Sequence, residues 1–146
     1  DSYTDNHPIT LIGRERLRAH CGKYAGVALD LIYDHAIASQ WADLSDEPLD
    51  RFTQRMYTLL GAHAALMPER TQRMLAFMSR HDWLSSYATI KGIEKALGGL
   101  SARVPGGEVL TGAGEILKEH RAEFIGECMR FLPQLRNHLN QADAKG

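Results

Sequence analysis

Two aspartates and a histidine lie close together in an otherwise apolar stretch of the sequence. Asp30 and Asp34 are four residues apart, a spacing that places both carboxylates on one face of a helix. Two neighbouring carboxylates repel each other and are costly on an apolar face, and a divalent cation relieves both problems. His35 projects about 100° further round the helix and can add a nitrogen ligand. This mixed set of oxygen and nitrogen donors predicts a site for manganese, iron or zinc rather than for calcium.

The same three residues also have a purely structural interpretation. Asp30 and Asp34 can cap neighbouring helices or pair with buried arginines, and His35 can be a hydrogen-bonded histidine of the core. A pair of acids on one helix is not a specific motif. The residues alone therefore leave both interpretations open.

The first eight residues hold a second group of possible ligands. Asp1, Asp5 and His7 come directly before Pro8, which is a typical first residue of a helix. A segment of this kind can bring ligands to a metal that another helix holds. The alternative is ordinary helix entry, in which Asp5 or Asn6 caps the helix.

A group of basic residues follows on the next stretch of chain. Arg14, Arg16, Arg18 and Lys23 lie within ten positions and form a local positive patch. Such a patch can guide an acidic protein partner to the surface. Alternatively, the patch is an ordinary solvent-exposed helix face without a binding role.

Helical periodicity positions these residues, because strand-like alternation is missing from the sequence. We expect a helix from Pro8 to about residue 20 that stops at Gly22, and a central, buried helix from Lys23 to about residue 42. Further helices are expected from 45–48 to about 62, from 68 onward, from 82 to 100 with a kink near Gly92, and from 113 to 140 with a kink or break at Pro133. Residues 104–107 form a loop and the last six residues a frayed tail. The expected fold is one all-helical domain over residues 1–146.

Composition excludes several classes of protein. The sequence has 146 residues, 44% of them hydrophobic, and a formal net charge of −1, so it is neither disordered nor typical of a nucleic-acid or membrane-surface protein. No apolar run is long enough to span a bilayer. Cys21 and Cys128 match no metal or redox spacing, and we interpret them as reduced thiols of a cytoplasmic protein rather than as a disulfide. Phosphate-binding loops, dinucleotide fingerprints and nucleophile elbows are missing from the sequence.

Short blocks stand in a fixed order along the first hundred residues. They read Asp-x-x-Thr-Asp-x-His-Pro over 1–8, Lys-Tyr-Ala-Gly over 23–26, Leu-Asp-x-x-Tyr-Asp-His over 29–35 and Asp-Trp-Leu-x-x-Tyr over 82–87, with Trp41 between the last two. Their order, spacing and residue types together resemble the acyl carrier protein phosphodiesterase family. The resemblance covers about residues 1–100 and extends more loosely into the last helix.

This resemblance implies a fold and an activity. The family is an all-helical bundle, regarded as a distant relative of the HD phosphohydrolases. Its members are metal-dependent hydrolases, typically using manganese, and they cleave the phosphodiester between 4′-phosphopantetheine and a serine of holo-acyl carrier protein. The products are apo-carrier protein and free phosphopantetheine, which connects the reaction to fatty acid biosynthesis.

The resemblance also implies roles for individual residues. The metal ligands that it implies are Asp34, His35, His7 and Asp1. The carboxylates expected to accept a proton from the attacking water are Asp30 or Asp5. An acidic carrier protein would dock on the basic residues Arg14, Arg18 and Lys23.

Two other functions stay open from the sequence. The chain can be a non-catalytic helical module that binds an acidic carrier protein, or an HD-type phosphohydrolase that acts on a nucleotide. Members of the family usually have some tens of residues, including further His and Asp positions, before the point where this sequence starts. We therefore expect an upstream segment to be missing and the metal shell to be incomplete.

Overall fold

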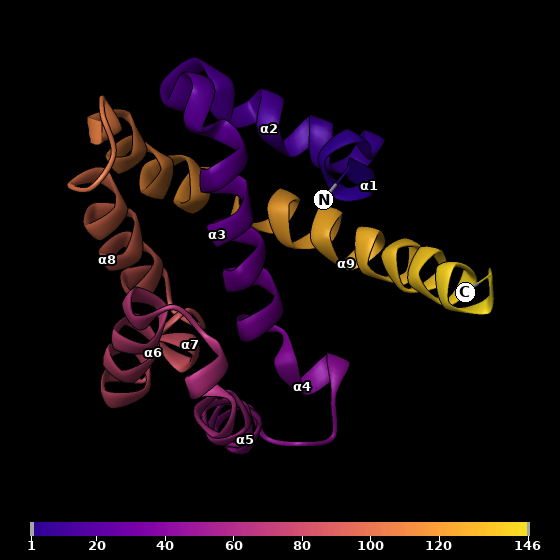
Figure 1. The fold of residues 1–146 in the computed structure, drawn as a ribbon. Coiled ribbons are helices and arrows are strands. Elements are labelled where there is room, and N and C mark those ends of the chain that lie inside the picture. The colour runs from indigo at the N-terminus through magenta and orange to yellow at the C-terminus, as the bar shows by residue number, and fades with distance from the viewer. Residues whose placement is uncertain (1, 146) are drawn as a thin grey trace.

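The computed structural model describes residues 2–145, and every regular element in that range is helical. Three short 3₁₀ turns join the longer helices. The prediction of an all-helical fold is confirmed, and Figure 1 shows the arrangement. The helices are α1 (Ser2–Asn6), α2 (Pro8–Cys21), α3 (Ala25–Ser39), α4 (Trp41–Leu44), α5 (Leu49–Ala62), α6 (Glu69–His81), α7 (Trp83–Ser86), α8 (Ile90–Ser101) and α9 (Ala113–Lys145).

The first predicted helix begins and ends where its sequence signals place it. Pro8 is the first residue of α2, and Gly22 ends the helix with a φ of 51°, a conformation that a side chain disfavours. The cap differs from the prediction. His7, rather than Asp5 or Asn6, accepts the hydrogen bond from the backbone N–H of Ile9 through its Nδ1, at 3.1 Å.

Helix α3 is central, as predicted. It packs against α2, α8 and α9, and Figure 1 shows it running through the middle of the molecule. Ala28, Ile32 and Ala36 are completely removed from solvent along its inner face. Gly13 of α2 lets the two helices approach closely, because a Cβ added there would lie 2.8 Å from a methyl of Leu29. The helix ends at Ser39, and the short α4 follows as a separate turn.

Helix α9 differs from the prediction in two ways. The interruption lies at His120, whose φ of −118° and ψ of 26° are non-helical, and Pro133 lies within the helix instead of breaking it. The helix also continues to Lys145, so the predicted frayed tail over 141–145 is wrong for the described residues. Figure 1 shows the C-terminal part of α9 projecting beyond the other helices.

Helices α5, α6 and α7 form a group beyond the end of α3 (Figure 1). The phenol oxygen of the buried Tyr57 accepts a hydrogen bond from the backbone N–H of Leu84 at 3.1 Å, which holds α7 against α5. The predicted kink near Gly92 is instead a separation: α7 ends at Ser86 and α8 begins at Ile90. The connection between α7 and α8 brings the backbone carbonyl of Tyr87 to His35 on α3.

Two further sequence predictions concern the core and the surface. Cys21 and Cys128 are both buried free thiols, as predicted. No helix within the described part of the chain combines the length and apolar character needed to cross a membrane.

Candidate functional site

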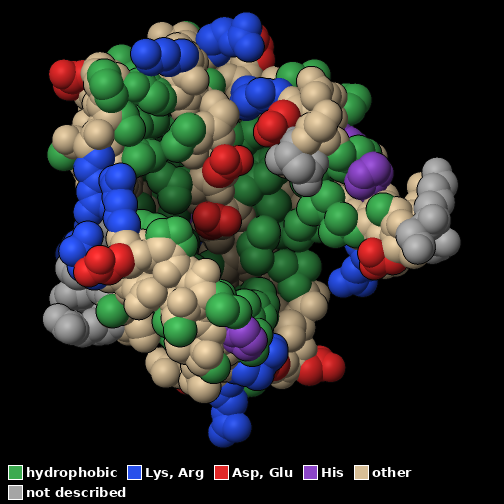
Figure 2. All heavy atoms as spheres, in the orientation of Figure 1, with side chains coloured by type: hydrophobic (Ala, Val, Ile, Leu, Met, Phe, Trp, Pro, Cys, Tyr) green, Lys and Arg blue, Asp and Glu red, His purple; other side chains and the backbone are tan. Residues whose placement is uncertain are grey.

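The aspartates of α3 lie in a hollow of the surface. Figure 2 shows acidic side chains following one another along this hollow, between largely hydrophobic walls and with basic side chains at the rim. Both Asp30 and Asp34 are reached by solvent. Among the side chains that the structure describes, no lysine or arginine forms an ion pair with either of them. The predicted structural alternative, in which buried arginines pair with these acids, is therefore not what this part of the chain shows.

The surroundings make these carboxyls weaker acids than usual. The protein displaces water from around Asp34, and the negative charge of Asp30 adds to this effect, so that its pKa rises to about 6. Loss of water also raises the pKa of Asp30, as does the charge of Asp5. A carboxylate with a pKa close to neutral pH is suited to accept a proton from water.

Two pockets open on the hollow, one beside each aspartate. The pocket beside Asp34 has a volume of about 190 Å³ and mainly apolar walls. The pocket beside Asp30 has a volume of about 250 Å³, and Arg103 contributes to its wall. Tyr87 lines both pockets and so separates them. Burial and the nearby charge of Asp34 raise the pKa of Tyr87, which keeps the phenol neutral.

His35 points into the core and holds the backbone next to these pockets. Its Nδ1–H donates to the carbonyl oxygen of Tyr87 at 2.9 Å, and its Nε2 accepts from Nε of Arg121 at 3.1 Å. Only 1% of the residue is exposed, and burial lowers the pKa of the imidazole, as does the Arg121 charge. His35 is thus a neutral histidine with both ring nitrogens in use, as in the structural alternative that the sequence left open.

Both ring nitrogens of His7 are also engaged in hydrogen bonds. Its Nδ1 accepts from Ile9, and its Nε2–H donates to Oε1 of Gln134 at 2.8 Å. The ring packs edge-on against Tyr3 and Phe131, with ring centroids 5.4 and 4.9 Å away. These contacts join the start of α2 to α9 and leave no ring nitrogen for a metal.

The fit of a divalent metal to these residues is therefore limited to oxygen donors. Across the part of the chain that the structure describes, no three His, Cys, Asp or Glu side chains come together as a metal site. Asp1 lies outside the described residues. Asp30 and Asp34 fit a cation by their chemistry, because two repelling carboxylates with raised pKa values gain from a positive charge between them. The mixed oxygen and nitrogen set predicted from the sequence is not assembled here.

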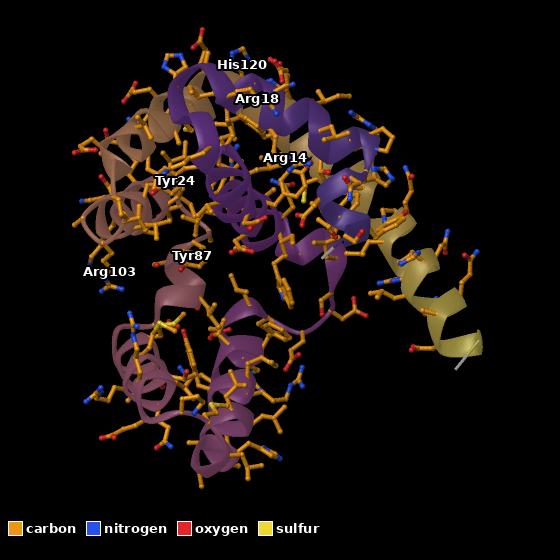
Figure 3. All side chains as sticks on the ribbon, turned by 45° about the horizontal axis from the view of Figure 1, so that its top comes forward. Arg14, Arg18, Tyr24, Tyr87, Arg103 and His120 are labelled. Atoms are coloured by element: carbon orange, nitrogen blue, oxygen red, sulfur yellow. The ribbon has the colours of Figure 1, made fainter. Side chains whose placement is uncertain are left out.

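One predicted docking residue, Arg14, faces the site instead of the outer surface. It is half-buried, its Nε is buried, and that atom has no hydrogen-bond partner among the described residues. Its positive charge lowers the pKa of Asp30, against the larger effects that raise it. Figure 3 shows Arg14 where α2 passes α3, with Tyr87 and Arg103 on the side of α7 and α8. This position allows the guanidinium to neutralise an anion in the hollow.

The remaining basic residues divide into an internal and an exposed group. Arg16 does not belong to a surface patch: its guanidinium forms two hydrogen bonds, 2.7 and 2.6 Å long, to the buried carboxylate of Glu127 on α9. Arg18 is exposed beside Glu15, and Lys23 lies over the ring of Tyr24. Only Arg18 and Lys23 thus form the exposed part of the predicted patch.

Sequence reasoning missed the role of three residues around the hollow. Tyr87 entered the sequence analysis only as the last residue of the 82–87 block, and Arg103 carried no signal because it follows the end of α8. Trp41 entered the sequence analysis only as part of the family resemblance, and the structure places it in the wall of the pocket beside Asp34. The spacing of Trp41 from Asp34, about two helical turns along one face, is the signal that could have found it.

The engagement of His35 gives a testable expectation. We expect His35→Leu to lower the free energy of unfolding by about 2–4 kcal/mol, because Arg121 and the Tyr87 carbonyl each lose a buried partner. We expect the Mn²⁺ affinity of the folded variant to stay within about twofold of the unsubstituted protein, since the imidazole has no free nitrogen. Urea unfolding and calorimetric Mn²⁺ titration measure the two effects. An unchanged stability with metal binding weakened more than tenfold would instead identify His35 as a ligand.

Comparison with known proteins points to one family. The acyl carrier protein phosphodiesterase family model matches residues 1–135. A protein of Photorhabdus laumondii named acyl carrier protein phosphodiesterase is 28% identical over 144 residues, which cover 98% of this chain and 73% of the relative. Proteins of the same name from Klebsiella pneumoniae (strain 342) and Escherichia coli (strain CFT073) are 29% and 27% identical, covering 92% and 99% of this chain and 70% and 74% of their own lengths. No solved structure matched the chain.

Proposed function

Because the chain belongs to the acyl carrier protein phosphodiesterase family, a family of hydrolases, we propose that it releases 4′-phosphopantetheine from holo-acyl carrier protein by hydrolysis. The bond cleaved is the phosphodiester to the carrier serine. The observation that carries the proposal is the carboxylate pair Asp30 and Asp34 in a hollow with a neighbouring arginine. This arrangement can activate water and balance the charge of a phosphodiester.

In this proposal the acidic residues of the hollow activate water, and Arg14 binds the phosphate. In the absence of a metal, Asp34 has a pKa of about 6 and is mostly ionised at neutral pH, so its carboxylate can also accept a proton from the attacking water, the role that the resemblance gives to Asp30 and Asp5. Asp30, and Asp5 whose charge acts on Asp30, are the carboxylates proposed to share this role. Arg14 binds the non-bridging oxygens of the phosphate, where a guanidinium forms charge-assisted hydrogen bonds.

Dependence on a divalent metal, manganese in the first place, is part of the proposal. Asp30 and Asp34 are the residues of this chain that would hold the ion through their carboxylate oxygens. A bound cation of this kind polarises the phosphoryl oxygens and lowers the pKa of water towards neutrality.

Docking of the carrier protein would involve the exposed basic residues. Arg18 and Lys23 lie on one edge of the molecule, near the junction of α2 and α3. An acidic carrier protein that docks there would be attracted electrostatically, and its binding would weaken as salt screens the charges.

The more distant relationship and the cellular location stay predictions. A relation to the HD phosphohydrolases would need an imidazole and a carboxylate on the same ion, and the structure directs the His35 ring to Tyr87 and Arg121 instead. The predicted cytoplasmic location rests on the interpretation of Cys21 and Cys128 and on the proposed substrate, and a place in fatty acid metabolism rests on the proposed substrate alone.

The decisive experiment incubates the protein with holo-acyl carrier protein and follows apo-carrier protein and phosphopantetheine by mass spectrometry. Parallel samples contain Mn²⁺, a chelator, or the chelator followed by excess Mn²⁺. We expect release of phosphopantetheine that the chelator abolishes and Mn²⁺ restores. A nucleotide panel assayed in the same buffer tests the HD-type alternative.

Two results would contradict the proposal. Binding of the carrier protein that is sensitive to salt but indifferent to chelator, without any release of phosphopantetheine, would identify a non-catalytic binding module. Turnover of a nucleotide in preference to holo-carrier protein would identify a nucleotide phosphohydrolase.

A further inference from the structure

The pocket beside Asp34 has walls that suit a small branched hydrocarbon group. Its apolar lining comes from three elements, α3–α4, α5 and the α7 region, and consists of Ile37, Ala38, Trp41, Leu49, Phe52, Leu84 and Tyr87. Its only polar lining residues are Asp34 and Thr53. The volume of about 190 Å³ is below the roughly 300–1,000 Å³ of whole small-molecule sites, so the pocket fits one group of a larger ligand.

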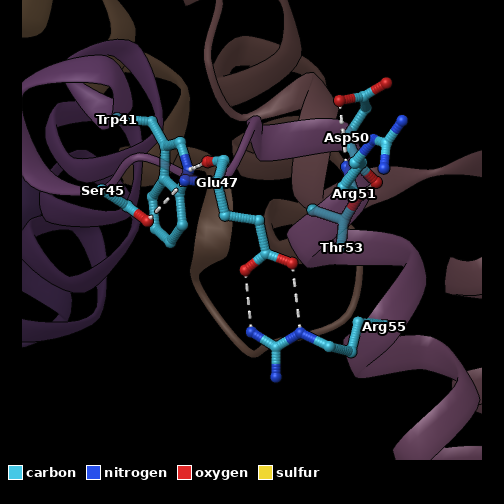
Figure 4. Close-up of polar contacts among 7 residues, drawn as sticks. All are labelled: Trp41, Ser45, Glu47, Asp50, Arg51, Thr53 and Arg55. Carbon is cyan, nitrogen blue, oxygen red and sulfur yellow. Dashed lines mark hydrogen bonds and ion pairs between the residues drawn. The ribbon is translucent and has the colours of Figure 1, made fainter.

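Hydrogen bonds fix the wall that α4 and α5 provide. The indole Nε1–H of Trp41 donates to the carbonyl oxygen of Glu47 at 2.7 Å (Figure 4). The Glu47 carboxylate is in turn bound by Arg55 through two hydrogen bonds of 2.9 and 3.2 Å. The Trp41 and Phe52 rings pack against each other with centroids 4.5 Å apart. The aromatic wall is therefore in place before any ligand binds.

The opposite wall is held just as firmly. The Tyr57 hydroxyl accepts from the backbone of Leu84, and the hydroxyls of Thr53 and Ser85 lie 3.2 Å apart. The imidazole of His35 holds the backbone of Tyr87. A pocket built in advance binds its ligand without an ordering cost, which favours a specific recognition role.

The chemistry of the proposed substrate places one such group at this distance from the phosphate. In 4′-phosphopantetheine the phosphate oxygen is followed by one CH₂ and then by a carbon that carries two methyl groups. On the serine side of the phosphorus there is only a CH₂ and then the polar backbone of the carrier. A phosphate next to Asp34 therefore brings a branched hydrocarbon group within reach of the pocket only on its pantetheine side.

Resting on the proposed function, we propose that this pocket binds the dimethyl group of the phosphopantetheine arm and thereby sets the direction of the substrate in the hollow. The serine and the carrier then lie towards Asp30 and the pocket that Arg103 lines. Substrate specificity then depends on three wall residues that take no part in catalysis, Trp41, Phe52 and Leu84. Removal of two methyl groups from an apolar site reduces affinity by about tenfold at roughly 0.8 kcal/mol for each group.

The test compares two holo-carrier proteins that differ only in these methyl groups, one with natural phosphopantetheine and one with its analogue lacking both methyls. We expect the unsubstituted protein to cleave the natural substrate with a kcat/KM about tenfold higher. Ala38→Leu, which fills the pocket, and Phe52→Ala, which opens its wall, should each reduce this preference to below about threefold. Leu59→Ala, on the exposed face of α5, serves as the matched control and should retain the preference.

The outcomes separate this inference from the proposed function. A preference retained in both pocket variants, or no preference in the unsubstituted protein, would overturn the inference while turnover still supports the function. If neither substrate is cleaved, the proposed function fails. Calorimetry with free phosphopantetheine and its analogue then decides the inference, because equal affinities would overturn it and a tenfold difference lost in Ala38→Leu would uphold it. Thermal unfolding of each variant shows which proteins are folded.

Discussion

The Asp34→Asn variant is expected to lose about 10³-fold in kcat on holo-acyl carrier protein while remaining folded, since removal of a general base typically costs 10²–10⁴-fold. The amide has nearly the shape of the carboxyl but cannot accept a proton from water, and it carries no charge to hold a cation. The side chain lines a solvent-reached pocket and supports no other element through an ion pair within the described residues. Single-turnover assays with a chelator-treated and a Mn²⁺-supplied sample measure the loss.

The Asp34→Asn substitution, which lowers activity, should leave the stability of the metal-free protein unchanged or raise it. The folded-state pKa of Asp34 is raised to about 6 from an ordinary value near 3.8, so the unfolded chain ionises first as pH rises. Below the lower value both states are protonated and Asp34 contributes nothing. Between the two values stability falls with rising pH, and the penalty is complete above the folded-state pKa.

Because water reaches Asp34, this penalty is at most about 1 kcal/mol after screening. Asp34→Asn should therefore unfold at the same temperature as the unsubstituted protein near pH 3.5 and at an equal or higher temperature at pH 7.5, without divalent cations. Calorimetric melting at both pH values tests the sign. A variant that melts lower at pH 7.5 would show that the carboxylate stabilises the metal-free fold.

Local signals were sufficient for most helix boundaries. Pro8 and Gly22 enclose α2 because proline suits a first turn and glycine a left-handed end. Pro133 misled the prediction, because a proline marks a possible break without showing whether neighbouring packing keeps the helix continuous. The irregularity at His120 has no sequence signal of comparable strength.

The candidate site was predictable only where it depends on one helix. The spacing of Asp30 and Asp34 defines their common face, and the structure keeps them close enough for the charge of Asp30 to raise the pKa of Asp34. The environment of His35 depends on Tyr87 and Arg121, which are 52 and 86 residues away in the chain. Spacing within a helix carries no information on such partners, so the ligand and core interpretations could not be distinguished.

The same limitation applies to the arginines of α2. Arg14 and Arg16 are two residues apart and chemically identical, yet the charge of Arg14 acts on Asp30 while Arg16 binds Glu127 on α9. Residues two positions apart on a helix face different neighbours. Without the positions of α3 and α9, both arginines read as part of one surface patch.

The position of Arg14 leads to the second large effect that we expect. Arg14→Met should lower kcat/KM for holo-acyl carrier protein by about 10²–10³-fold, the usual cost of removing one group that stabilises charge in the transition state. Arg14→Lys should recover only part of this activity, because an ammonium group cannot bind two phosphate oxygens side by side. Arg14 forms no ion pair among the described residues and its Nε has no hydrogen-bond partner there, so the substitution removes no ion pair of that part of the chain.

Arg18→Met is the matched control, because Arg18 lies on the same helix but is exposed beside Glu15. It should change only KM, by less than about fivefold, and reduce the salt dependence of turnover, as a docking residue does. Equal effects of Arg14→Met and Arg18→Met, confined to KM, would place Arg14 in carrier docking and remove it from the phosphate site. A fall in kcat for Arg14→Met alone, with unchanged melting temperature, would place its guanidinium on the phosphate that Asp30 and Asp34 face.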